Sequence, residues 1–426
     1  MLKLIVQHSP QLLAFLCGLQ LRLSKPQWQH VLRLADTLIV SEVRHKTITS
    51  FYRLLVDAPD PSNGADALRI SPWTAEDLRA PLRHFILADL VAYAQQNDHW
   101  TLYVSLDDSL GEKDKGTRHL EAVEYHHDHT KRQGKNTPYY TNGTVHVEVR
   151  LELGARSYAY DWRLYLREKT VRRLNRQRPP EQRLRFRKKT TLAHAMLAEL
   201  HQLLPPGFQV YVLFDSWDAA NRLLKFCRRQ SWYVVCAIKS NRKLDDQKLS
   251  QWPQALRHQR YQRVQLTATD QRPRLYLVRT LQGKLNRLSF DVCVLISQRH
   301  PRDKHPKYFL CTDLSLAAQQ ILSIYQKRWP VEVDNFYVKQ HLGLADFRVQ
   351  SYEATEKWFA IVFLAFVFLQ WRLNHAHAKE QWHSLADVVR QHRYEHARTL
   401  LETACQEAAQ LRDYFPVLKR FLCQPT

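Results

Sequence analysis

Four polar side chains between residues 325 and 339 have the types and spacing of a site that handles phosphate. Tyr325, Arg328, Glu332 and Lys339 follow one another at intervals of three, four and seven residues. At about 100° per residue, these positions share one narrow stripe of a helix. A carboxylate beside a guanidinium and an ammonium suits a metal ion next to a phosphodiester, because the acid holds the metal and the cations hold phosphate oxygens. The alternative interpretation is an amphipathic helix with a solvated charged face.

Two neighbouring residues define this stripe further. Asp334 falls on the opposite side of the helix, so Glu332 is the only carboxylate of the stripe. Pro330 lacks an amide donor and clashes with the preceding turn, which predicts a kink or a new helix start at that point. Glu332 and Lys339 share a face in either case, whereas a kink would rotate the two stripe residues before the proline.

The uninterrupted pattern Y-x2-R-x3-E-x6-K resembles the signature of bacterial insertion-sequence transposases of the DDE class. These are cut-and-paste enzymes with a ribonuclease-H-like catalytic core. The resemblance covers roughly residues 100–370 and implies an α/β fold, with a mixed sheet flanked by helices. It also implies that Glu332 is catalytic, that Tyr325, Arg328 and Lys339 bind DNA near the transposon end, and that two catalytic aspartates follow buried strands upstream.

The first strand and its acids lie near residue 100. Thr101–Leu106 alternates and is rich in β-forming residues, and we expect it to end at Asp107-Asp108-Ser109. Ligands of open α/β sheets collect beyond the carboxyl ends of strands, although an Asp pair near a glycine is also typical of a plain turn. Periodicity does not choose between the two aspartates. In the family resembled, Ser or Thr follows the catalytic aspartate two positions on, which selects Asp107.

The second acid follows another buried strand. Phe208–Phe214 is a run of seven apolar and β-forming residues bounded by turn residues, and it ends at Asp215. A helix is predicted from about Asp218 to Arg229, with Asp218 as its N-cap. Asp215 is thereby left as the functional candidate. The resemblance implies the same order of strand, aspartate and helix.

The resemblance implies that Asp107, Asp215 and Glu332 converge at one edge of the sheet and bind two Mg²⁺ or Mn²⁺ ions. Carboxylate oxygens are the ligands that these hard cations prefer. Two such ions would activate the attacking oxygen and stabilise the leaving oxygen of an in-line displacement. The implied partners are double-stranded DNA, as terminal inverted repeats and as target, and a second copy of the chain in a homodimer on the DNA ends.

Composition agrees with a polyanionic partner. Lys and Arg number 63 against 41 Asp and Glu, which gives a net charge of +22. Such an excess attracts polyanions and gains free energy from counterion release, although it does not separate DNA from RNA or an anionic membrane. The 426 residues suffice for two to four domains with a sizeable core.

Cysteine usage and hydropathy predict a cytoplasmic protein. The seven cysteines are scattered singly without a CxxC pair, as is typical of reduced core thiols. The most apolar run, Trp358–Leu369, has 12 residues, fewer than the about 20 that cross a bilayer. The N-terminus makes a weak signal peptide. We therefore expect no membrane partner and, from the resemblance, a location with the bacterial or archaeal nucleoid.

Pattern and resemblance divide the chain into five regions. They are a helical N-terminal region (1–97), a first part of the catalytic core (98–238), a β-rich insertion (239–305), a second part of the core with the signature helix (306–375), and a helical C-terminal region (376–426). The N-terminal region could bind DNA ends or simply support the core. The C-terminal region could pack on the core or on another protomer.

Three polar features outside the signature have two interpretations each. The run His126 to His129 lies in a predicted loop, 112–141, and could be a metal site or, more simply, a solvated loop. The basic segment 167–190 could contact phosphates as a mobile loop or be a solvated charge run. Trp252 could stack on an unpaired base or belong to the core.

The predicted function is a DNA transposase that cuts and joins the ends of an insertion sequence by two-metal phosphoryl transfer. One alternative is an inactive or domesticated transposase that binds DNA without cutting it, which the presence of all three acids disfavours. Another is a ribonuclease-H-like nuclease that cuts without strand transfer. The long β-rich insertion and the Tyr, Arg and Lys of the signature favour strand transfer.

Overall fold

The structure is a computed structural model that describes residues 2–43, 45–132, 138–216, 219–267, 272–301, 303, 305–376, 380 and 382–422. Asp218, predicted above as a helix N-cap, lies outside the described residues, and so does the side chain of His129. The strands are β1 (Thr101–Glu112), β2 (Glu124–Arg132), β3 (Pro138–Leu153), β4 (Arg156–Tyr165), β5 (Gln209–Phe214), β6 (Tyr233–Ile238), β7 (Lys243–Leu244), β8 (Gln247–Lys248), β9 (Gln262–Thr267), β10 (Pro273–Lys284), β11 (Asp291–Gln298) and β12 (Lys307–Cys311).

Helices surround these strands. They are α1 (Pro10–Gly18), α2 (Lys25–Val40), α3 (Ile48–Tyr52), α4 (Pro61–Arg69), α5 (Glu76–Asn97), α6 (Glu168–Asn175), α7 (Lys189–Leu203), α8 (Asn221–Arg229), α9 (Trp252–Ala255), α10 (Ala318–Gln326), α11 (Pro330–Gln340), α12 (Tyr352–Asn374), α13 (Leu385–Leu411) and α14 (Phe415–Phe421), with short 3-10 turns at Pro180–Gln182 and Leu249–Gln251.

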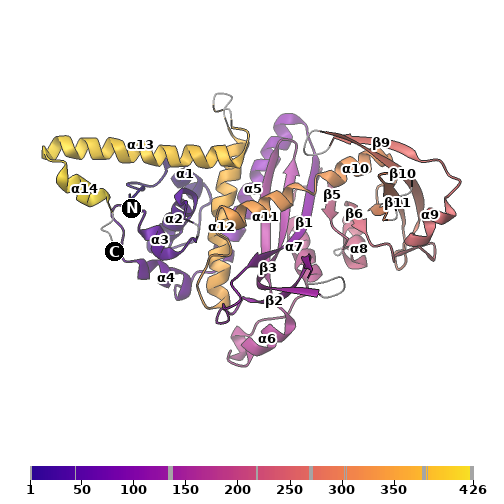
Figure 1. Cartoon of the computed structure of the whole chain (residues 1–426), viewed down its shortest axis with the longest axis horizontal. Helices are drawn as coiled ribbons and strands as arrows, with labels where there is room; N and C mark the ends of the chain where they lie inside the picture. Colours follow the sequence, from indigo (N-terminus) through magenta and orange to yellow (C-terminus); the bar gives the residue numbers. More distant parts are fainter. Residues whose placement is uncertain are drawn as a thin grey trace.

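A ten-stranded mixed sheet forms the centre of the molecule. Its order is β2-β3-β1-β5-β6-β12-β11-β10-β9, and β4 pairs with β3. The pairs β1–β5 and β5–β6 are parallel, whereas β3, β12 and the strands beyond them pair antiparallel. This arrangement confirms the predicted α/β class and agrees with a ribonuclease-H-like sheet. The strands of the predicted insertion, β9 to β11, continue this same sheet through β12 at one end of the molecule (Figure 1).

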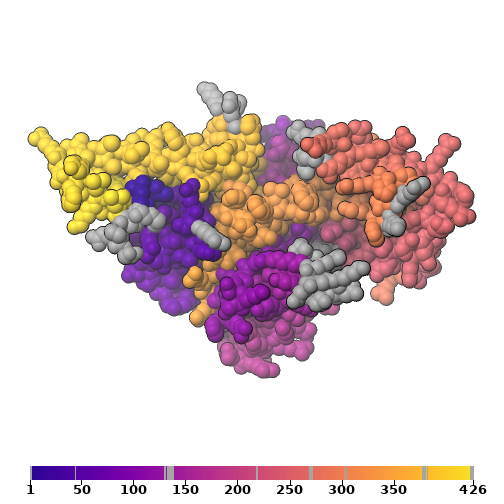
Figure 2. Space-filling view, viewed as in Figure 1, coloured from indigo at the N-terminus to yellow at the C-terminus, as the bar shows by residue number. Residues whose placement is uncertain are grey.

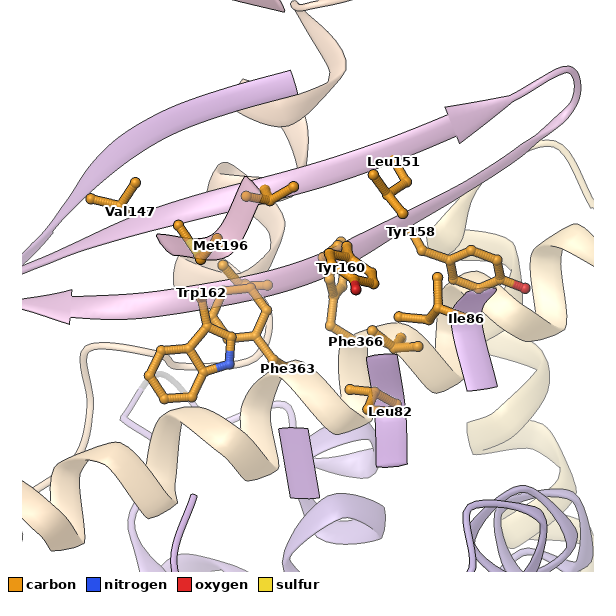
Figure 3. Packing of buried hydrophobic residues seen from close by; sticks show 14 of the residues in the cluster. Leu82, Ile86, Val147, Leu151, Tyr158, Tyr160, Trp162, Met196, Phe363 and Phe366 are labelled. Carbon is orange, nitrogen blue, oxygen red and sulfur yellow. The ribbon is translucent and has the colours of Figure 1, made fainter. Parts of the chain in front are cut away.

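The core lies where α12 and α5 pack against β3 and β4. Trp162 of β4 stacks on Phe363 of α12 with ring centroids 5.6 Å apart, and Tyr158, Leu82 and Ile86 join the same cluster (Figure 3). Long aromatic side chains bury large areas, so this contact fixes the helix on the sheet. The apolar run within α12 is therefore buried between the sheet and the other helices.

The helix that contains this run is longer than the 12-residue run itself. The helix α12 has 23 residues and is long and apolar enough, by composition, to cross a membrane. Within the protein, however, 89% of its apolar window is buried. Its burial, not its length, identifies it as the central helix of the core.

Strand β1 runs further than predicted. It does not end at Leu106 but continues to Glu112, paired with β3 over its whole length. The two strands lie close together at Gly143, where a Cβ atom would lie 2.2 Å from the carbonyl oxygen of Gly111. The turn expected at Asp107–Ser109 is therefore wrong, because the ladder with β3 overrides the local turn preference.

Two other segments predicted as loops also have regular structure. Within 112–141, β2 pairs with the first part of β3, and the basic segment 167–190 contains α6. Helix α4 begins at Pro61, with Asp60 accepting from the backbone of Ser62 at 2.7 Å. These elements have weak local patterns and depend on tertiary packing. Trp252 packs against the main hydrophobic core, in agreement with its core interpretation.

The two ends of the chain meet at the end of the molecule opposite β9 to β11 (Figures 1 and 2). The backbone of Lys3 donates to the carbonyl of Phe421 at 2.9 Å, and α13 packs on α2 and α12. The N-terminal helices in turn pack on α12, so they share one hydrophobic core with the sheet.

Candidate active site

One cleft of about 1000 Å³ is lined by all three predicted catalytic acids. Asp107 comes from β1, Asp215 follows β5, and Glu332 lies in the first turn of α11. Lys339 of the same helix also lines the cleft. The structure thus brings together side chains that three separate parts of the sequence supply.

The pairing of β1 distinguishes the two adjacent aspartates. Successive residues of a strand point to opposite faces. Ser105, two residues before Asp107, donates to the carbonyl of Lys327 at 3.3 Å, so this face is directed at the turn that leads into α11. Asp108 instead forms an ion pair with Lys189 at the start of α7. Asp107 is the aspartate that faces the helix carrying Glu332.

Burial raises the pKa of Asp107 to about 7. The guanidinium of Arg328 opposes this shift, whereas the carboxylates of Asp108 and Glu332 add to it. A partly buried carboxylate with other acids nearby carries negative charge that its surroundings do not fully balance. A bound cation would balance it.

Asp215 reaches the cleft because β5 runs parallel to β1. Ser105 of β1 pairs with Leu213 of β5, so the two strands approach the same edge of the sheet. The backbone N–H of Ser216 donates to Oδ1 of Asp215 at 2.5 Å and orients the carboxylate. Lys239, directly after β6, lies at this edge as well and lines the cleft.

Arg328 holds Glu332 rather than facing the cleft. Helix α10 ends at Gln326 and α11 starts at Pro330, which confirms the predicted restart. Across the turn between them, Nη2 of Arg328 lies 2.5 Å from Oε1 of Glu332. Tyr325 packs edge-on against Phe309, with centroids 4.8 Å apart. Neither Tyr325 nor Arg328 lines the cleft, so the described contacts of Arg328 are those of a residue that positions Glu332.

Lys339 lies between the cleft and the buried side of the site. Its Nζ donates to the carbonyl of Leu110 at 3.4 Å, and the side chain is partly buried. Burial lowers the pKa of Lys339, while Asp107, Glu112 and Glu148 act in the opposite direction. The ammonium is thus placed among several acids of β1 and β3.

A layer of buried polar side chains lies between β3 and α11. Arg150 of β3 pairs with Asp334 at 3.0 Å, and Nε2 of His146 lies 3.1 Å from Oδ1 of Asn335. Asp334 therefore has a structural partner, in agreement with its predicted orientation away from the stripe. Glu148, opposite Asp107 in the ladder, is fully buried, and burial raises its pKa to about 8.

The polar layer and Lys239 were absent from the sequence prediction, whereas contact with phosphates was one of the two interpretations of the basic segment 167–190. Lys239 lines the cleft, and so do Arg167 and Lys189 from the basic segment 167–190. The charge of that segment was the available signal, whereas Lys239 could have been found as the first residue after a buried strand. The sequence shows that His146 and Glu148 are polar residues of a strand, but it does not show that another element buries them.

The described side chains of the histidine-rich run on β2 do not converge on one point. His126 is buried and His127 is exposed, as expected for neighbours on a strand. Burial lowers the pKa of His126 to about 3, and Lys189 and Arg167 reinforce the shift. Asp128 accepts a hydrogen bond from Thr141 at 2.9 Å. The described side chains of the run line the cleft without forming a ligand set of their own.

The three acids fit a divalent metal ion. They offer carboxylate oxygens, the ligands that Mg²⁺ and Mn²⁺ prefer. Burial raises the pKa of Asp107, the carboxylates of Asp108 and Glu332 add to the shift, and a cation bound where the three acids line the cleft would offset this cost.

Comparison with known protein families gives two matches. Residues 183–368 are similar to the transposase DDE domain, and residues 38–275, more than half of the chain, are similar to the DDE superfamily endonuclease. The second match contains Asp107 and Asp215, and the first contains Asp215 and Glu332. A comparison with curated proteins finds no match.

Proposed function

Because this chain belongs to the DDE superfamily of transposases and endonucleases, we propose that it is a DNA transposase that cuts and joins the ends of an insertion sequence. Members of the superfamily act on DNA and generally use divalent metals. The observation that carries the proposal is the convergence of Asp107, Asp215 and Glu332 in one cation-rimmed cleft.

We propose that these three carboxylates hold two Mg²⁺ or Mn²⁺ ions. When bound, such ions lower the pKa of an attacking water or 3′-hydroxyl and stabilise the leaving oxygen. Arg328 keeps Glu332 in place through their ion pair and remains charged, because its acidic neighbours raise its pKa against the effect of burial.

The cations around the cleft would bind the phosphates that flank the scissile bond. Lys339 supplies a point charge beside Asp107, and Lys239 and Arg167 line the cleft from other elements. Tyr325 and Arg328 were predicted to contact DNA directly. Arg328 is paired with Glu332 and lies over the ring of Tyr325. We therefore propose that Tyr325 and Arg328 contribute to binding of the transposon end by holding Glu332 in position.

We also propose the wider organisation of the enzyme. The functional divisions are 1–97, 98–238, 239–305, 306–375 and 376–426, with the first as a helical support that can also contact DNA ends. The chain acts as a homodimer on two terminal repeats, in the cytoplasm and at the nucleoid. A net charge of +22 supports binding to DNA over such a surface.

A plasmid cleavage assay tests the proposal. The substrate is a supercoiled plasmid that carries the sequences flanking the gene, incubated with Mn²⁺ and either wild type or Glu332→Gln. We expect metal-dependent cleavage at the ends by the wild type alone, because the amide cannot replace the charged ligand. Glu42→Gln is a control at an exposed acid that pairs with Arg393, away from the cleft.

The products separate the alternatives. Joined products indicate a transposase, whereas cuts without joining indicate a nuclease of the same core. DNA binding without any cleavage by the wild type would favour the inactive, DNA-binding alternative and contradict the proposal.

A further inference from the structure

A second cluster of ligand-type side chains lies where α13 meets α2 and the start of α1. Nε2 of His392 and Nε2 of His396 lie 2.8 and 3.0 Å from the same oxygen, Oδ1 of Asp36. Nδ1 of His8 lies 2.8 Å from the other oxygen, Oδ2. Three histidines from two separate segments therefore contact the carboxylate of Asp36, which belongs to a third segment.

The helical spacing of the two histidines directs both rings to one point. His392 and His396 are four residues apart on α13, so they share a face of the helix. The donor atoms of Asp36 and the two histidines all lie within 4.8 Å of one another. In a tetrahedral zinc site, ligand atoms about 2.0–2.1 Å from the metal are roughly 3.4 Å apart. Small side-chain shifts would open the cluster to that size.

Because Asp36 is fully buried, its carboxylate needs a cation or hydrogen-bond donors beside it. The side chains of Asp36 and His392 are fully buried, and that of His396 is 4% exposed. A buried carboxylate is costly unless a cation or several hydrogen bonds balance it. The nearby Arg372 is already paired with Glu395 at 3.0 Å. The partner that balances Asp36 is therefore the histidine cluster itself, either through its N–H hydrogen bonds, together with one from the backbone of Ser9, or through a metal ion that it holds.

We propose that Asp36, His392 and His396, with His8 as a fourth ligand, form a structural site for a transition-metal dication of the zinc class. Three imidazole nitrogens and one carboxylate oxygen make a closed four-coordinate set, which such ions favour and Mg²⁺ does not. The ion would fasten α13 to the N-terminal helices. His8, with 22% of its side chain exposed, lies on the solvent side and gives the ion a route of entry.

Cobalt(II) and zinc binding to the full-length chain, without an affinity tag, tests this site. Millimolar Mg²⁺ is present throughout, so that the carboxylate site of the cleft holds its own preferred ion. We expect one equivalent of Co²⁺ to give the intense visible absorption of tetrahedral coordination, and Zn²⁺ to displace it and raise the melting temperature. His396→Gln should weaken this binding by more than about 100-fold, because even outer-shell partners of a metal cost up to that factor.

Two further variants make the test decisive. His383→Gln, at an exposed position just before α13, should bind Co²⁺ as the wild type does. His8→Gln, at the most exposed of the four ligands, should weaken binding while leaving the metal-free melting temperature nearly unchanged, and it decides the question if His396→Gln does not fold. A wild type without tetrahedral absorption, or variants at His8 and His396 that bind Co²⁺ as tightly as the wild type, would overturn the site and leave a proton-balanced cluster.

Discussion

From the partly buried carboxylate of Asp107 we predict an effect on stability that can be measured separately from its catalytic use. Its pKa of about 7 lies above the value of 3.8 for an ordinary aspartate. As the pH rises, the unfolded chain therefore ionises first, and the folded state loses stability progressively between about pH 4 and pH 7. Above pH 7 the full cost remains, at most about 4 kcal/mol for a shift of about three units.

Substituting Asp107→Asn removes this cost because the amide does not ionise. Relative to wild type, the metal-free variant should gain about 2 to 3 kcal/mol more at pH 8.5 than at pH 5. In a chain of this size, that corresponds to a difference of a few °C in melting temperature. The measurement is thermal unfolding of both proteins in a chelator at the two pH values, together with plasmid cleavage, which the variant should lose.

The neighbouring aspartate provides a matched control. Asp108→Asn makes the same chemical change one residue along, but it breaks the ion pair with Lys189 and should not stabilise the protein at pH 8.5. Saturating Mg²⁺ should stabilise the wild type and not Asp107→Asn, because binding to the folded state adds to its stability. If the melting temperatures of wild type and Asp107→Asn show the same dependence on pH, the assignment of a raised pKa to Asp107 in the cleft is refuted.

The cleft makes three further predictions. Asp215→Ala should abolish cleavage in the plasmid assay while electrophoretic mobility shifts show DNA binding largely intact; loss of binding with normal cutting would contradict its assignment as a ligand. Lys339→Ala should weaken binding to the flanking DNA and reduce the slope of log K against log salt by about one unit, and an unchanged slope would remove Lys339 from the phosphate contacts. Chelation of divalent ions should stop cleavage, and activity that survives the chelator would end the metal-dependent mechanism.

Local signals predicted those parts of the site that local chemistry determines. Pro330 predicted the break between α10 and α11 because a missing amide and a fixed φ act within one turn. Even so, Arg328 still reaches Glu332, since the turn between the helices keeps backbone angles close to helical, with φ −56° and ψ −38° at Trp329. The stripe of the signature therefore continues across the break between the two helices, and Arg328 is buried beside Glu332.

Non-local pairing determined the rest. The residues after Leu106 resemble a turn, but β3 supplies a continuous ladder and keeps them in β1. Helix α11 covers the polar side chains of His146 and Arg150 on β3, and the partner of His146 is 189 residues away in the sequence. Residues so far apart in the sequence give no local signal that they are in contact. The polar residues of β3 could therefore be identified from the sequence, whereas their burial could not.

The way each acid is held makes single substitutions in the cleft interpretable. Asp107 is fixed by the ladders of β1 with β3 and β5, and Asp215 by the parallel strand that precedes it. Glu332 belongs to a helix that Arg150 anchors through Asp334, on the side away from the cleft. None of these supports depends on attraction among the three carboxylates, which repel one another. Removing one acid should therefore relieve repulsion and leave the other two in place, so that a loss of cleavage reports on chemistry and not on collapse of the site.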